Sequence, residues 1–380
     1  MSHILYFFPE NLMLQRHGNN VRALELLKYF KDRGISVDFV SASSDFFAQG
    51  GIEFLKEEGL IENGYVLETP SRKKNQIKYM FKHSLPNKIS YLRKYFRQGK
   101  LVKVDQFRDI LEKKKYDKIV ISYVFWSHLI DSKELLKGAE LIIDTHDFIT
   151  AQYKEEKKFK TGAFLDKELE LLNKFDKILT ISVDEKYIFS QFLNKEVIWA
   201  PHPIAFNGAV SKKDYEYDLI YVASDNVHNV KSAKWFFENV YPLLNEEVKI
   251  CVIGKVSEHI EDKPNIIKLV SVDDLTDYYK KSKIAICPML SGTGLKIKVV
   301  EAMSYGLPVV CNERGLDGLS SKYNNGCLAT NSPSEFAENI HKLLSDNDLY
   351  NKVSEQSVNH FMQNYERNVV YKMLDSIFIN

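Results

Sequence analysis

The residues best suited to chemistry lie in one stretch, 288–318 (PMLSGTGLKIKVVEAMSYGLPVVCNERGLDG). A loop with two glycines, Gly292 and Gly294, follows an apolar run and precedes a helix pattern that begins near Lys296. Backbone N–H groups at a helix start attract anions, and glycines let such a backbone approach a phosphate closely. Lys296 and Lys298 add two cations in the first turn, where they oppose the helix dipole, so the pattern favours a bound anion.

A carboxylate follows one turn later. Glu301 could accept hydrogen bonds from a vicinal diol such as a ribose. Phosphate and ribose in one site would indicate a nucleotide. The alternative is that the glycines only turn the chain and that the lysines are solvated.

These residues stand within a repeated alternation of strand-like and helix-like segments. The predicted strands lie at 4–8, 37–42, 118–123, 141–145, 177–182, 197–201, 218–223, 249–254, 266–270, 284–289 and 307–312. Such alternation predicts parallel sheets with right-handed helical crossovers. We therefore expect an α/β protein with two Rossmann-like, doubly wound halves.

The length of 380 residues predicts two domains. We place an N-terminal domain at 1–204, a C-terminal domain at 205–364 and a last helix at 365–380 that packs back on the first domain. Ligands of doubly wound sheets bind at the carboxyl ends of the strands, so we expect the site in a cleft between the domains. The 44% share of hydrophobic residues excludes a disordered chain, and we expect the four cysteines to be reduced thiols.

The pattern GTGLKIKVVEAMSYGLPVV, followed by Gly315 and Asp317–Gly318, resembles the donor-site signature of glycosyltransferase family 4. These are retaining GT-B enzymes, also called glycosyl transferases group 1. The resemblance implies two facing Rossmann-like domains and a nucleotide-diphosphate sugar as donor. It also implies transfer to a glycan or lipid-linked acceptor with retention of the anomeric configuration.

The resemblance assigns donor residues. It implies that Glu301 holds the nucleotide ribose and that the backbone at Thr293, Gly294 and Leu295 contacts the donor sugar and phosphates. The family commonly has a second glutamate eight positions before the first, and Thr293 stands there instead. We interpret this departure as a variation in sugar contact.

The basic residues that would neutralise the phosphates show a second departure from the family pattern. The family often places an arginine and a lysine in the loop that opens the second domain. Lys231 matches the lysine, but Asp225 stands at the arginine position. We therefore expect Lys296 and Lys298 to carry more of the phosphate charge than is usual.

The resemblance assigns the acceptor side to the first domain. His146 follows the predicted strand 141–145 and is the candidate catalytic residue, expected to contact the donor sugar and to order the reacting groups. The alternative is a histidine that satisfies a turn. Gly18, in the loop after the first strand, could approach the diphosphate or the acceptor, or could serve only the turn.

Enzymes of this type are thought to let the leaving diphosphate help to deprotonate the acceptor hydroxyl. The protein then contributes positioning and charge stabilisation, so we expect no catalytic carboxylate pair, no metal and no other cofactor. The Asp-x-Asp at Asp346 and Asp348 is interpreted as a helix cap.

A basic, aromatic segment covers residues 72–103 and includes Arg93, Lys94 and Arg97. Such a segment can bind an anionic membrane surface, each cation contributing roughly 1 kcal/mol. We expect a cytoplasmic protein, peripheral on the inner face of the membrane, that acts on a polyprenyl-diphosphate or lipopolysaccharide acceptor in cell-surface polysaccharide assembly. A solvated helical face is the alternative, and nothing indicates nucleic-acid binding.

Two other functions remain compatible with the sequence. A GT-B nucleotide-sugar epimerase would bind the same donor class without an acceptor. A non-catalytic GT-B partner subunit would keep the fold and lose the site, but the retention of Lys296, Lys298 and Glu301 argues against it.

Overall fold

The computed structural model describes residues 2–13, 18–68, 96, 101–154, 156–208 and 215–379. Arg93, Lys94 and Arg97 lie outside the described residues, as does most of the basic segment. The chain divides into two compact units, which consist almost entirely of Met1–Ile181 with Glu185–Ala200, and of Ser182–Asp184 with Pro201–Phe378. Within the described ranges, none of the helices is both long and apolar enough to span a membrane.

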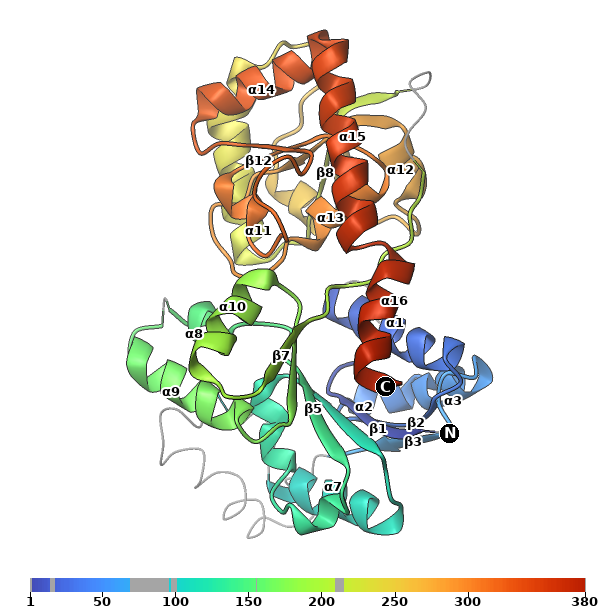
Figure 1. Ribbon diagram of the computed structural model, residues 1–380. Helices are drawn as coiled ribbons and strands as arrows, with labels where there is room; N and C mark the ends of the chain where they lie inside the picture. Colours follow the sequence, from blue (N-terminus) through green and yellow to red (C-terminus); the bar gives the residue numbers. More distant parts are fainter. Residues whose placement is uncertain are drawn as a thin grey trace, which may run out of the picture. The chain divides into compact units, whose positions relative to one another are not determined.

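The first unit is a seven-stranded parallel sheet with helices packed around it (Figure 1), in the order β3-β2-β1-β4-β5-β6-β7. Its strands are β1 (His3–Phe8), β2 (Ser36–Ser41), β3 (Asn63–Val66), β4 (Lys118–Ser122), β5 (Glu140–Asp144), β6 (Lys177–Thr180) and β7 (Glu196–Trp199). The helices before residue 200 are α1 (Gly18–Asp32), α2 (Ser44–Ala48), α3 (Gly51–Glu57), α7 (Leu101–Lys113), α8 (Ile149–Gln152), α9 (Thr161–Leu172) and α10 (Val183–Phe192). Short 3₁₀ helices cover Val124–Leu129 and Glu134–Leu136.

The second unit is a six-stranded parallel sheet in the order β10-β9-β8-β11-β12-β13. Its strands are β8 (Tyr217–Val222), β9 (Ile250–Ile253), β10 (Ile266–Leu269), β11 (Ser282–Cys287), β12 (Val309–Cys311) and β13 (Cys327–Ala329). Its helices are α11 (Val227–Trp235), α12 (Thr276–Lys280), α13 (Ile297–Ser304), α14 (Pro333–Ser345), α15 (Asn347–Asn364) and α16 (Arg367–Phe378). Shorter helical turns cover Phe236–Val240 (a π turn), Tyr241–Leu243, Lys255–His259 and Glu313–Leu316.

The α/β prediction is confirmed, because every predicted strand is found within a few residues of its expected place. The apolar runs are buried; β1, for example, buries Ile4 to Phe8 completely. Two strands escaped prediction, β3 and β13, because they are short and only partly buried and so lack an apolar run. Each extends its sheet in parallel register, beside β2 and β12.

Local signals also set the helix ends. Ser332 accepts a hydrogen bond from the Glu335 N–H at the start of α14. Asp346 caps α15 by accepting from the N–H groups of Asp348 and Leu349, which confirms the Asp-x-Asp as a cap. The cysteines are free thiols, three of them buried.

Each sheet has one point where the chain reverses its direction of winding. In the first sheet that point lies between the neighbours β1 and β4, and in the second between β8 and β11. Loops that leave adjacent strands in opposite directions open a crevice at the carboxyl ends of those strands, where ligands of such sheets bind. We therefore expect functional residues in the loops after β1, β4, β8 and β11.

Candidate functional site

The loop between β11 and α13 carries the predicted anion site. Gly292 and Gly294 adopt positive φ angles of 97° and 73°, which side chains with a Cβ rarely adopt. Lys296 occupies the N-cap position of α13 and has no side-chain capping bond there. The two glycines thus bring partly exposed loop backbone to the amino end of α13, as the spacing predicted.

Three side chains of α11 hydrogen-bond to this loop or to the helix after it. The bonds join Ser232 Oγ to Leu290 N (3.1 Å), His228 Nδ1 to Ser291 Oγ (2.8 Å) and Asn229 Oδ1 to Lys298 Nζ (2.9 Å). The helix after β8 therefore holds the loop after β11 across the winding reversal of the sheet.

Sequence reasoning missed His228 and Asn229. The available signal was a run of polar residues, SDNVHN, between a strand and a helix. Asn226 caps α11 by accepting from Asn229 N–H, which turns the next polar side chains toward the same end of the sheet. Lys231, the predicted phosphate ligand on this helix, is exposed.

The two lysines that precede Glu301, Lys296 and Lys298, make different contacts. Lys296 is buried, and its Nζ donates to the carbonyl oxygens of Thr293 (3.2 Å) and Gly294 (2.8 Å), so it braces the glycine loop. Lys298 is partly exposed, and its Nζ lies 5.5 Å from the centre of the Tyr221 ring. Burial lowers the pKa of both lysines below the usual value.

Glu301 lies on α13 beyond these cations. Its Oε2 accepts a hydrogen bond from the Tyr279 hydroxyl at 3.0 Å. The Tyr279 ring is stacked on Tyr305, with centroids 4.8 Å apart. Burial raises the pKa of Glu301, while the Tyr279 hydrogen bond and the charge of Lys298 act in the opposite direction. A carboxylate fixed in this way is suited to accept hydrogen bonds from a diol.

Gly318 supports the same loop from the other side. A Cβ built on it would lie 2.8 Å from Leu295 Cα, and its φ is +80°. The chain therefore needs glycine at 318 for its backbone to lie against Leu295.

The Gly318→Ala variant is expected to lose about 1–3 kcal/mol of stability through backbone strain and to shift the Leu295 backbone. Gly138→Ala is the matched control, because Gly138 also has a positive φ, +87°, but no atom within 4 Å of its built Cβ. Nucleotide affinity should fall in Gly318→Ala and stay unchanged in Gly138→Ala, as measured by calorimetry. Equal affinity in both variants would contradict a role for this contact.

In the first unit, His146 follows β5 with an unusual backbone, φ +59°. Its side chain is buried, its ring is stacked on Tyr123 with centroids 4.4 Å apart, and its Nε2 lies 3.2 Å from Asp144 Oδ2 and 3.2 Å from Ser122 Oγ. A left-handed conformation in a buried histidine is a form of strain often found at functional turns. Nε2 thus lies within reach of both the Asp144 carboxylate and the Ser122 hydroxyl.

Asp144 is itself held by Arg22 of α1. The guanidinium donates through Nε to Oδ2 (2.9 Å) and through Nη2 to Oδ1 (2.9 Å), and both side chains are buried. Such a bidentate pair fixes the orientation of both partners. Arg22 therefore fixes the orientation of the Asp144 carboxylate, and Asp144 in turn orients the ring of His146.

His146 is expected to stay neutral across the physiological range. Burial lowers its pKa to about 4, the charge of Arg22 acts in the same direction, and Asp144 opposes them. A folded-state pKa below the ordinary 6.5 stabilises the fold above pH 6.5 and loses that contribution as the pH falls toward 4. NMR of the labelled imidazole should show no titration between pH 5.5 and 8, and a midpoint near 6.5 would contradict this.

Gly18 is exposed at the start of α1. The next residue, Asn19, donates through Nδ2 to the Tyr123 hydroxyl (2.6 Å) and to Glu10 Oε2 (2.9 Å). The start of α1 and the turns after β1 and β4 thus meet near the ring on which His146 is stacked. The roles assigned to Gly18 and His146 stay predictions.

Among the residues that the structure describes, one group of side chains has the composition of a possible metal site. His3, Asp38 and Glu62 lie together at the amino ends of their strands, away from the sites above. Lys114 Nζ already lies 3.3 Å from Asp38 Oδ2 and 3.4 Å from Glu62 Oε2. The ammonium group takes the place of a cation, so this group is an ion-pair network.

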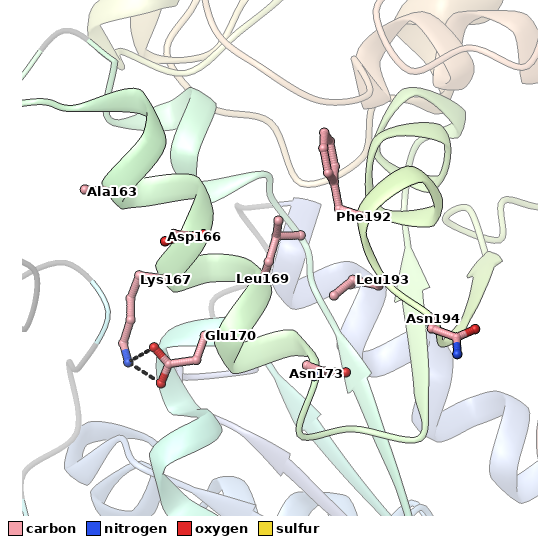
Figure 2. Close-up of a pocket in the computed structure, with 9 residues that line it drawn as sticks. All are labelled: Ala163, Asp166, Lys167, Leu169, Glu170, Asn173, Phe192, Leu193 and Asn194. Carbon is pink, nitrogen blue, oxygen red and sulfur yellow. Dashed lines mark hydrogen bonds and ion pairs between the residues drawn. The ribbon is translucent and has the colours of Figure 1, made fainter.

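A groove of about 790 Å³ lies on the flank of the first unit, between α9 and the end of α10 (Figure 2). Leu169 and Leu193 line it, with Phe192 beside them, and Lys167 binds Glu170 along α9. It contains none of the predicted site residues.

Comparisons with known proteins agree with this arrangement. Residues 216–346 match the family described as glycosyl transferases group 1. A protein of Klebsiella pneumoniae, named an uncharacterised 44.6 kDa protein in cps region, is 20% identical over 94% of this chain and 95% of the relative. An uncharacterised glycosyltransferase of Haemophilus influenzae is 33% identical over 26% of this chain and 28% of the relative.

Solved structures share the fold over the whole chain. Sucrose-phosphate synthase from Thermosynechococcus elongatus has a TM-score of 0.73 at 11% identity, covering 100% of this chain and 98% of that one. HepE of Anabaena in complex with UDP has a TM-score of 0.69 at 12% identity, covering 99% of both chains. The chain thus has two Rossmann-like units of the GT-B type, and residues 216–346 of the second unit match the glycosyl transferases group 1 family.

Proposed function

We propose that the chain transfers a sugar from a nucleotide-diphosphate sugar to a glycan or lipid-linked acceptor, with retention of configuration. The observation that carries the proposal is the arrangement at the amino end of α13, where a glycine loop, Lys298 and Glu301 follow one another. Partly exposed backbone and a cation suit a diphosphate, and a fixed carboxylate one turn later suits a ribose.

The similar structures support this donor class. HepE was solved with UDP and with UDP-glucose, and a TarM variant with UDP and alpha-GlcNAc-glycerol. In the proposed reaction the second unit binds the donor, while the turn of His146 contacts the donor sugar. We propose no metal, because the cations and backbone N–H groups of the loop can stabilise the leaving diphosphate.

We place the reaction in the assembly of a cell-surface polysaccharide or lipopolysaccharide on the cytoplasmic side of the membrane. Support comes from the words "in cps region" in the name of the Klebsiella relative and from the similar fold of a lipopolysaccharide outer core galactosyltransferase. Membrane binding by the basic segment stays a prediction. Liposomes with anionic lipids should sediment the protein, and neutralising Arg93, Lys94 and Arg97 should abolish this.

A thermal-shift screen across UDP-, GDP-, ADP- and dTDP-sugars tests the donor class, because a ligand that binds the folded state raises its apparent stability. We expect one nucleotide class to raise Tm, and nucleoside diphosphate to be released only when acceptor is present. NMR of the product should show the anomeric configuration of the donor. Failure of every sugar nucleotide to bind would overturn the proposal, and isomerisation without acceptor would indicate an epimerase.

A further inference from the structure

Glu168 on α9 is a buried carboxylate with an unusual pair of partners. Its side chain is 1% exposed, and it accepts hydrogen bonds from the backbone N–H groups of Ile149 (to Oε1, 2.8 Å) and Thr150 (to Oε2, 2.7 Å). These two residues begin α8, directly after the turn that carries His146. A side chain from a different helix therefore holds the end of that turn.

We propose that Glu168 is a positioning residue, whose carboxylate fixes the start of α8 and thereby the turn Asp144–Asp147 with His146. The turn is then held at both ends. At its beginning Arg22 binds Asp144, and at its end Glu168 binds the backbone of Ile149 and Thr150. Neither Arg22 nor Glu168 is assigned a contact with substrate.

The local sequence gives α8 no cap of its own. Phe148 occupies the N-cap position and offers no side-chain hydrogen bond to the first turn. An Asp or Ser at that position would satisfy such N–H groups at less cost than burial of a distant carboxylate. The chain instead uses Glu168, 19 residues along from Ile149, and so joins α9 to the His146 turn.

The bonding of Glu168 depends on its charge. Burial raises its pKa to about 7, and the neighbouring Asp147 acts in the same direction, while the Ile149 and Thr150 hydrogen bonds oppose them. Below this pKa one oxygen becomes a hydroxyl donor and can no longer accept its N–H well. The turn should therefore be held best above pH 7, and activity should fall as the pH drops through 7.

Glu168→Gln tests the proposal, because the amide keeps the size of the side chain but offers one acceptor oxygen and a repelling NH₂ group. Glu170→Gln is the matched control. Glu170 lies two residues further along α9 on the side that lines the groove, where it binds Lys167 (Figure 2). Both variants are made in the full chain.

We expect kcat of Glu168→Gln to fall roughly 10- to 100-fold at pH 8, as small misplacements of reacting groups do, while KM for the donor stays within about twofold. The acid limb of the pH profile should disappear with the carboxyl group. Glu170→Gln should match the wild type in kcat and in pH profile. A Glu168→Gln kcat within about twofold of wild type, or a change in donor KM equal to that in kcat, would overturn the proposal.

The kinetic readout rests on the proposed function, so a second readout is independent of it. Amide hydrogen exchange of a peptide that spans 147–152 should be faster in Glu168→Gln than in Glu170→Gln. In the wild type, after correction for intrinsic rates, protection there should drop as the pH falls below 7. This wild-type measurement stands even if the variant does not fold, and constant protection across pH 6–8 would overturn the proposal.

Discussion

Replacing Glu301 with glutamine is expected to weaken binding of a nucleoside diphosphate roughly 30- to 100-fold. The amide loses the negative charge that strengthens hydrogen bonds from a ribose diol, and a hydrogen bond to a charged group contributes about 1.5–3 kcal/mol. The fold should survive, because burial already disfavours the ionised form of Glu301. Loss of affinity without loss of Tm is therefore the expected signature.

Calorimetry with a nucleoside diphosphate and its 2′,3′-dideoxy analogue measures this directly. The wild type should prefer the diphosphate that carries both hydroxyls, and Glu301→Gln should bind the two alike. Glu313→Gln is a suitable control, since Glu313 is exposed and binds Asn331 beyond β12. If Glu301→Gln still preferred the diphosphate with both hydroxyls as strongly as the wild type does, Glu301 would not bind the ribose.

Lys298→Gln is expected to weaken the diphosphate contact by a similar factor, roughly 30- to 100-fold. Asn229 and the Tyr221 ring hold the ammonium group, and it forms no ion pair with any carboxylate among the residues that the structure describes. Partial burial disfavours the charged form of this lysine, and a bound phosphate would offset that cost. The Lys298→Gln substitution should weaken binding of a nucleoside diphosphate more than binding of the corresponding nucleoside.

The pH dependence of binding gives a second test of Lys298. Burial lowers its pKa, and the protonated form binds the anion, so affinity should begin to fall at a lower pH than an ordinary lysine would require. Titration of nucleotide binding between pH 7 and 10 should show this alkaline loss in the wild type and not in Lys298→Gln. Lys234→Gln, on the exposed side of α11 beside Glu238, should behave as the wild type does.

The arrangement of the glycine loop could be predicted because its parts are contiguous in sequence. A strand, two glycines, a helix start and a carboxylate one turn later fall within 282–301, so local propensity alone brings them together. The strand alternation likewise predicted the strands of both sheets except two edge strands, β3 and β13. These edges carry few apolar side chains, so no pattern marked them.

The contacts that refine the site could not be predicted, because they join residues far apart in the chain. Ser232 and His228 reach the loop over 58 and 63 residues, and Asn229 reaches Lys298 of α13 over 69. Arg22 reaches Asp144 over 122 residues. The fold-back of Lys296 onto the loop carbonyls depends on rotamers that sequence periodicity does not encode. The polar type of such residues is visible in a sequence, but their partners are not.

The hydrogen bonds between α11 and the glycine loop have a kinetic consequence. A loop already held by Ser232 and His228 needs little further ordering when a nucleotide arrives, so little conformational entropy is lost on binding. Encounter should then be fast and similar for different sugar nucleotides. Selection among donors should appear in how long each one stays bound, which stopped-flow dissociation can measure.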